Sequence, residues 1–282
     1  RDGWDFVDWS PMTEGERRIF CHLLATQAVG LGAGLLDAIG RNGDSYRRLQ
    51  ARLREAGRHA WWADPATATF GTSHHVNAMA IRRGILAPDE AAALFKRTLA
   101  ADPPLMMTYW HRYADLDAAG RVGQVQWGLD YIRRHWGHAL RGGHTTLWEA
   151  FDPTWLGSPD PHAVSMVGAE HARYGGYETS LCHGWSAGPA VWLHREVLGV
   201  RPAIPGNGAP GFAIVEFNPA LGSGTRGLQW ARGTIPTPRG PIRVSLDRRG
   251  PEPVAEIVVP PGVEVRLPER PRETWRVRIR EQ

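Results

Sequence analysis

Cysteine and lysine are both scarce in this chain of 282 residues, and their scarcity excludes several kinds of protein. The two cysteines, Cys21 and Cys182, lie far apart in the sequence and cannot by themselves form a disulfide framework or a four-ligand zinc site. Lys96 is the only lysine, so the other basic side chains are arginines. No uninterrupted apolar run approaches the roughly 18 residues that span a bilayer, which excludes a membrane-spanning helix on this count. The P-loop motif G-x-x-x-x-G-K and the zinc-protease motif H-E-x-x-H are also missing.

Tryptophan, in contrast, is abundant, with 13 residues. An indole has a flat apolar face and one N–H donor, so it suits both a large helical core and stacking against a sugar ring. The net charge of +4 arises in the C-terminal part, because residues 201–282 carry 13 basic and 8 acidic side chains whereas residues 1–200 carry 20 and 21. Arginines and glutamates are interleaved there, which we interpret as a solvated sheet face, and we expect no nucleic-acid partner.

The composition changes near residue 200, which predicts a domain boundary. All 12 histidines and eleven of the 13 tryptophans come before this point, whereas thirteen of the 22 prolines follow it. We therefore expect one domain over residues 1–200 and a second over residues 201–282, joined within the Gly/Pro-rich stretch 199–211.

The first domain has the periodicity of helices. Thr13 is the expected N-cap of the first helix, with Glu16 three residues later as in a capping box. Further helices are expected to begin at Asp44, Ser73 and Pro88. The remaining expected helices cover residues 105–116, 122–138 and 180–198. Helices of this length joined by short loops predict helical hairpins.

The second domain alternates with a period of two, which indicates strands. Strands are expected at residues 212–217, 228–233, 242–246, 254–259, 263–267 and 275–279. Short strands at this spacing favour a small antiparallel β-sandwich. Because Trp275, Val277 and Ile279 alternate with arginines, we expect the last strand to have one buried and one solvated face.

The segment 143–149 is the strongest candidate for a catalytic site. It lies between two expected helices and places Glu149 directly after Trp148. A carboxylate in such aromatic surroundings is partly desolvated and could act as a general base. A structural alternative is a helix N-cap, because Thr145 or Thr146 followed by Glu149 resembles a capping box. The spacing alone slightly favours the cap.

The segment 180–189 could line a sugar site. His183 could donate a hydrogen bond to a sugar hydroxyl, and Trp185 could provide a stacking platform. A satisfied core histidine is the structural alternative for His183. Cys182 lies directly beside His183, which is poor geometry for a thiol nucleophile, so a thiol hydrolase is not expected.

Two other clusters of polar residues have weaker interpretations. Asp5 and Asp8 are flanked by aromatic residues and could bind hydroxyl groups, although Asp8 could instead terminate a helix. His74 and His75 are adjacent and cannot both point from one helical face, so a metal site is not expected. No cofactor is expected for this chain.

Taken together, these segments resemble the α-L-rhamnosidases of glycoside hydrolase family 78. The matching pieces are GWDFVDWSP (3–11), HTTLWEAFDP (144–153), TSLCHGWSAGPAVWLHREVLGV (179–200) and the stretch 211–245. The resemblance implies an (α/α)6 barrel of six helical hairpins followed by a C-terminal β-sandwich. About seven helices are expected where the family has twelve, so we expect an N-terminally truncated barrel in this chain.

The resemblance also implies a reaction, which is the inverting hydrolysis of terminal non-reducing α-L-rhamnose. Glu149 is then the general base that activates water. The residues expected to line the substrate site are Asp5, Asp8, Trp9, His144, Trp148, His183 and Trp185. In the family the general acid lies upstream of the piece matched by residues 3–11, so we expect this chain to lack the acid and to be inactive alone.

The expected partner is a rhamnose-containing oligosaccharide or glycoside, and neither a nucleic acid nor a membrane is expected. Two alternatives stay open at this point. One is a six-hairpin glycosidase or lyase with another sugar specificity, and the other is a non-catalytic carbohydrate-binding relative.

Overall fold

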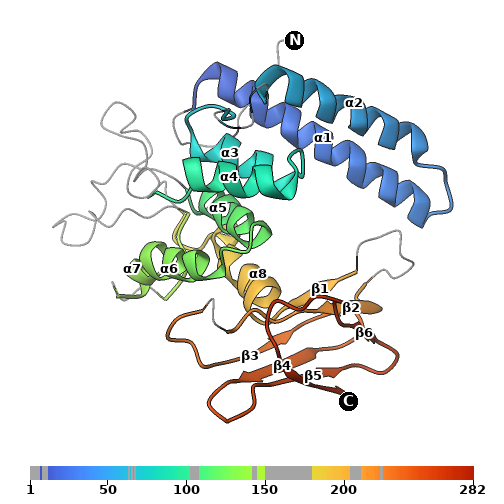
Figure 1. Cartoon of the computed structure of the whole chain (residues 1–282), viewed down its shortest axis with the longest axis vertical. Helices are drawn as coiled ribbons and strands as arrows, with labels where there is room; N and C mark the ends of the chain where they lie inside the picture. The colour runs from blue at the N-terminus through green and yellow to red at the C-terminus, as the bar shows by residue number, and fades with distance from the viewer. Residues whose placement is uncertain are drawn as a thin grey trace. The chain divides into compact units, whose positions relative to one another are not determined.

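A computed structural model describes residues 7, 12–62, 64, 66, 68–101, 108–141, 145–149, 180–203, 211–222 and 225–282 (Figure 1). Helices come first and two β-sheets follow, which confirms the expected fold class. The chain separates into two compact units. The helical unit comprises residues 1–33, 44–123 and 130–189, and the β unit comprises residues 34–43, 124–129 and 190–282. The division into domains 1–200 and 201–282, which the composition predicts, stays a prediction.

The first helices begin where their capping signals predict. Their bounds are α1 (Glu14–Ala38), α2 (Asp44–Trp61), α3 (His74–Arg82), α4 (Pro88–Thr98), α5 (Tyr109–Arg121), α6 (Val125–His135) and α7 (Gly137–Arg141). Asp44 and Pro88 are the first residues of α2 and α4, and Ser73 is the N-cap of α3. Two later predictions were less accurate, since α5 begins at Tyr109 and the helix expected over residues 122–138 is interrupted at Trp136.

Glu16 fixes the start of α1 and joins it to the start of α3. Its carboxylate accepts the backbone N–H of Thr13 at 3.0 Å, and the Thr13 hydroxyl accepts the N–H of Glu16 at 3.2 Å, which is the predicted capping box. The same carboxylate accepts the N–H groups of Thr72 and Ser73, both at 2.8 Å. Burial alone would raise the pKa of Glu16, but these donors outweigh it and lower the pKa to about 2.

Helix α1 is apolar over most of its length. It is long and apolar enough to cross a membrane, and 28% of its most apolar window is buried in the structure. Counting uninterrupted apolar residues misses this helix, because Thr26 and Gln27 break the run without adding charge. The exclusion of a spanning helix on that count was therefore too strict. Core helices of soluble proteins and signal sequences share this composition, so α1 alone does not indicate a membrane.

The helix expected over residues 180–198 is divided into three short helical pieces. A 3₁₀ helix covers Gly184–Ala187, α8 covers Gly188–Trp192 and a π-helical turn covers Leu193–Val197. The small residues in this stretch serve close packing, because a Cβ at Gly188 would lie 2.5 Å from the ring of Tyr113.

The β unit contains two sheets (Figure 1). The three-stranded sheet has the order β1 (Val200–Pro202), β2 (Ile214–Phe217) and β6 (Glu264–Arg266). The four-stranded sheet has the order β3 (Trp230–Ile235), β4 (Ile242–Asp247), β5 (Val254–Val259) and β7 (Arg276–Glu281). Antiparallel pairs predominate, and the pairs β2–β6 and β5–β7 are parallel.

Alternate residues of the strands form the core of the β unit. The buried positions include Ile242, Val244 and Leu246 of β4, Ala255, Ile257 and Val259 of β5, and Val215 and Phe217 of β2. This alternation is typical of two sheets that enclose a common core. We predicted that the last strand buries the face that carries Ile279. This prediction is wrong at Ile279, which is exposed because β7 lies at the edge of its sheet.

Candidate active site

Glu149 lies in a short extended segment that is hydrogen-bonded to residues 180–183. The backbone N–H of Glu149 donates to the carbonyl oxygen of Ser180 at 2.8 Å. The N–H of His183 donates in turn to the carbonyl oxygen of Leu147, also at 2.8 Å. These two bonds join segments that are distant in sequence, and they place the Glu149 side chain beside that of His183.

Two buried residues hold the same segment in place. The Ser186 side chain is fully buried, and its hydroxyl donates to the carbonyl oxygen of Trp148 at 2.5 Å. The carbonyl oxygen of Ser186 accepts the indole N–H of Trp136 at 2.9 Å. Trp136 packs against Tyr109, with ring centroids 4.9 Å apart. The backbone that carries Glu149 is therefore tied to the start of α5 and to the end of α6.

The Glu149 carboxylate is largely buried, with 12% of the side-chain area exposed. Its Oε2 accepts the backbone N–H of Ser180 at 3.2 Å and lies 3.9 Å from Nδ1 of His183. No other hydrogen bond reaches this carboxylate from the residues that the structure describes. A carboxylate has two oxygens and about four acceptor positions, so it could still accept a hydrogen bond from a water molecule.

The described contacts do not support the helix N-cap alternative for this segment. Residues 145–149 are not helical. The Thr146 hydroxyl donates to the carbonyl oxygen of Leu181 at 2.5 Å, and the Glu149 carboxylate accepts from Ser180 rather than from a threonine. The reciprocal contacts of a capping box are therefore absent among the described residues of this segment.

Stacked aromatic rings lie beside His183. Its ring centroid is 4.3 Å from that of Trp185, and Trp185 stacks on Trp110 at 6.3 Å with an interplanar angle of 29°. The indole nitrogen of Trp185 is buried and has no hydrogen-bond partner among the described residues. Apolar ring faces next to a carboxylate and an imidazole offer both C–H contacts and hydroxyl partners, the combination that a sugar requires.

The structure brings three of the predicted site residues together, namely Glu149, His183 and Trp185. Trp148 contributes its backbone carbonyl, which accepts the Ser186 hydroxyl. The predicted residues Asp5, Asp8, Trp9 and His144 lie outside the described residues.

Sequence reasoning missed Trp110 and Ser186. Trp110 lies in the first turn of α5, whose start was predicted four residues too early. Ser186 lies in a stretch of small residues that predicts close packing in general but not a hydrogen bond to Trp148 in particular.

His74 and His75 are buried in helix packing. Nδ1 of His74 lies 3.5 Å from Oδ2 of Asp115, and the ring of His75 contacts that of His111 at a centroid distance of 3.7 Å. Within the described part of the chain, no group of three or more His, Cys, Asp or Glu side chains is placed to hold a metal ion.

Comparisons with known proteins bear on both units. Residues 199–278 match the family model described as the bacterial alpha-L-rhamnosidase C-terminal domain. An alpha-L-rhamnosidase of Alteromonas sp. (strain LOR) is 30% identical over 111 residues, which is 39% of this chain and 10% of that protein.

Solved structures of similar fold include the GH78 rhamnosidase of Bacillus sp. GL1, with a TM-score of 0.72 and 22% identity over 99% of this chain. The Streptomyces avermitilis alpha-L-rhamnosidase complexed with L-rhamnose has a TM-score of 0.66 and 17% identity over 89% of this chain. This chain covers 29% and 23% of those two chains, respectively. It therefore spans less than a third of the length of the proteins that it resembles.

Proposed function

We propose that this chain is a member of the α-L-rhamnosidases of glycoside hydrolase family 78 and takes part in hydrolysing terminal α-L-rhamnose. The match of residues 199–278 to the rhamnosidase C-terminal domain and the similarity of fold over 99% of the chain support this proposal. The observation that carries this proposal is the buried Glu149 carboxylate, which lies beside His183 and the stacked rings of Trp185 and Trp110. The substrate is a rhamnose-containing oligosaccharide or glycoside.

Glu149 is the general base of the proposed reaction. A water molecule hydrogen-bonded to its carboxylate gives up a proton to Glu149 as the water oxygen attacks the anomeric carbon. Attack from the side opposite the leaving group inverts the anomeric configuration. The N–H of Ser180 and the backbone bonds of the Glu149 segment keep the carboxylate in one position, so little reorganisation is needed during the reaction.

His183 and Trp185 bind the sugar in this proposal. The His183 ring is partly exposed and could bond a ring hydroxyl, while the indole of Trp185 covers a C–H face. Trp110 supports Trp185 from behind by stacking on it.

An inverting hydrolase also needs a second carboxyl group about 6.5–9.5 Å from the base, which protonates the leaving oxygen. We assign no residue of this chain to that role, so slow turnover of ordinary glycosides by this chain is expected. A 2,4-dinitrophenyl α-L-rhamnoside avoids this requirement, because its leaving group departs as a stable anion.

Calorimetric titration with L-rhamnose tests the sugar site without depending on the acid. The chain should bind L-rhamnose saturably, and Trp185→Ala should weaken binding by about tenfold or more because the platform is lost. Trp230→Ala is the matched control, since Trp230 is an exposed tryptophan of the β unit. The proposal fails if no saturable binding occurs, or if the two substitutions have equal effects.

A further inference from the structure

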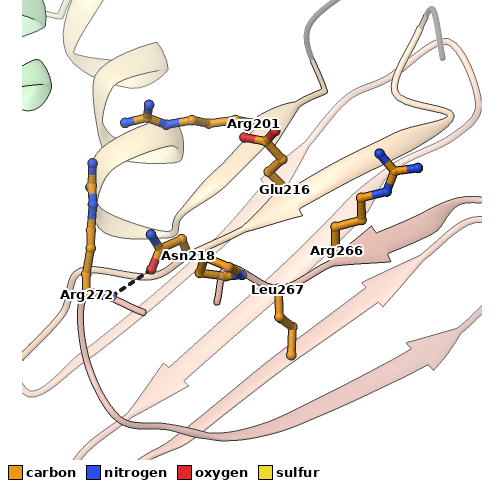
Figure 2. A pocket seen from close by; sticks show the side chains of 7 residues that line it. Arg201, Glu216, Asn218, Arg266, Leu267 and Arg272 are labelled. Atoms are coloured by element: carbon orange, nitrogen blue, oxygen red, sulfur yellow. Dashed lines mark hydrogen bonds between the residues drawn. The ribbon is translucent and has the colours of Figure 1, made fainter. Parts of the chain in front are cut away.

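A pocket of about 360 Å³ opens on the three-stranded sheet of the β unit (Figure 2). Its polar lining comes from Arg201 of β1, Glu216 of β2, Arg266 of β6, and the loop residues Asn218 and Arg272. Its volume lies within the range of about 300–1,000 Å³ that is typical of small-molecule sites. Every residue that lines it belongs to the β unit, so the pocket shares no residue with the site proposed around Glu149.

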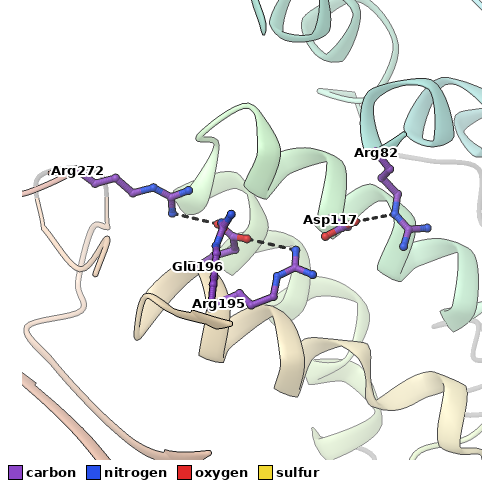
Figure 3. A network of polar contacts seen from close by, with 6 residues as sticks. Arg82, Asp117, Arg195, Glu196 and Arg272 are labelled. Carbon is purple, nitrogen blue, oxygen red and sulfur yellow. Dashed lines mark hydrogen bonds and ion pairs between the residues drawn. The ribbon is translucent and has the colours of Figure 1, made fainter. Parts of the chain in front are cut away.

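A buried carboxylate organises the arginines on one side of this pocket. Glu196 is fully buried, and its Oε2 accepts Nη2 of Arg201 at 2.5 Å and Nη1 of Arg272 at 3.0 Å. Its other oxygen lies 3.4 Å from Nη2 of Arg195 (Figure 3). Arg201 and Arg272 therefore share one negative charge, which leaves an excess of positive charge beside the pocket.

Arg201 and Arg272 retain hydrogen-bond donors for a ligand. A guanidinium has five N–H donors, and among the described residues each of these two gives one to Glu196. The loop that carries Arg272 is itself fixed, because its backbone N–H donates to Oδ1 of Asn218 at 3.0 Å. Two positioned guanidinium groups match the oxygens of a carboxylate.

The rest of the pocket differs from a simple anion site. Figure 2 shows Arg201 and Arg272 on one side and Arg266 on the other, with Glu216 and Asn218 between them. Arg266 is paired with Glu264 at 2.6 Å and does not add an unbalanced charge. Glu216 would repel an anion placed against it but can accept hydrogen bonds from hydroxyl groups, and Leu267 and Pro268 supply apolar surface.

We propose that this pocket binds a sugar acid, whose carboxylate is bonded by Arg201 and Arg272 and whose hydroxyl groups are bonded by Glu216 and Asn218. The ligand class follows from the lining, which combines an excess of guanidinium at one end with hydroxyl acceptors and apolar surface in the middle. This site is additional to the rhamnose site proposed at Glu149 and does not depend on it.

Calorimetric titrations with D-glucuronate, D-glucose and acetate test the proposal, because glucuronate and glucose differ only at C6. Glucuronate should bind about tenfold or more tightly than either of the other two, since only glucuronate offers both the carboxylate and the hydroxyl groups. Equal binding of glucose would overturn the role of the arginines. Equal binding of acetate would mean that the pocket is an anion site only, which would overturn the recognition of a sugar.

Substitutions locate the binding in this pocket. Arg272→Gln should weaken glucuronate binding about tenfold and leave L-rhamnose binding unchanged, which separates this proposal from the one for Glu149. Arg276→Gln is the matched control, because Arg276 is an exposed arginine paired with Glu252. Should Arg272→Gln unfold the β unit, Arg272→Lys keeps a positive charge near Glu196 but loses the planar fork. Unchanged glucuronate affinity in the folded variant would overturn the proposal.

Discussion

The helical unit and the β unit each bury a glutamate, and they satisfy its carboxylate in different ways. Glu149 in the helical unit accepts one backbone N–H and has a histidine 3.9 Å away among the described residues. Glu196 in the β unit contacts three arginines, Arg195, Arg201 and Arg272.

This difference separates a carboxylate that can take part in chemistry from one that serves the fold. Three guanidinium groups contact the oxygens of Glu196, so a water molecule has little access to it. Glu149 keeps acceptor capacity and lies beside the partly exposed side chain of His183. Burial alone therefore does not distinguish these two carboxylates, whereas the number and kind of their partners does.

The largest expected effect is on catalysis and concerns Glu149. Glu149→Gln should lower the kcat for 2,4-dinitrophenyl α-L-rhamnoside by about 10²–10⁴-fold, because an amide cannot take a proton from water. Thermal unfolding should be nearly unchanged, since the amide oxygen can still accept the N–H of Ser180. Release of dinitrophenolate measures the rate, and Glu252→Gln at an exposed site is the control. A variant as fast as the wild type would exclude Glu149 as the base.

The next effect is on stability and concerns Glu196. Glu196→Gln should lower the free energy of unfolding by about 3–5 kcal/mol, because three arginines lose the buried charge that they share. Urea unfolding followed by tryptophan fluorescence measures the change. If Glu196→Gln cost no more stability than Glu149→Gln, the contrast between the two glutamates would be lost.

Glu16 is a third case, in which backbone N–H groups saturate the carboxylate. Its pKa is about 2 in the folded chain, against an ordinary value of 4.5, so its ionised form stabilises the fold above pH 4.5. That contribution, at most about 3 kcal/mol, should be lost as the pH falls from 4.5 towards 2. Urea unfolding at several pH values should show a shallower pH dependence in Glu16→Gln than in the wild type. Identical slopes would contradict the hydrogen-bond account of this carboxylate.

Local signals made much of the fold predictable. The capping box of Thr13 and Glu16 and the helix starts at Asp44, Ser73 and Pro88 depend on residues within one turn, and the structure confirms them. The buried alternation of β4 and β5 is likewise local, since successive side chains of a strand point to opposite faces.

The remaining features depend on contacts between distant segments. The stacking of Trp110 on Trp185 joins α5 to the 3₁₀ helix, and no local pattern specifies such a pair. The parallel pairing of β2 with β6 depends on the path of the chain between them. β1 has only three residues, too few to show an alternation. For the candidate site, the motif containing Glu149 could be found in the sequence, but the hydrogen bonds that hold it could not.

Chemical rescue tests the role of Glu149 most directly. The variant Glu149→Ala leaves room for a small nucleophile where Glu149 would otherwise direct a water molecule, and azide needs no base to attack the anomeric carbon. With 2,4-dinitrophenyl α-L-rhamnoside as the substrate, added azide should restore turnover of the variant, and NMR should identify the product as β-L-rhamnosyl azide. Turnover that azide does not change, or an azide product that keeps the α configuration, would contradict the assignment of Glu149 as the base of an inverting reaction.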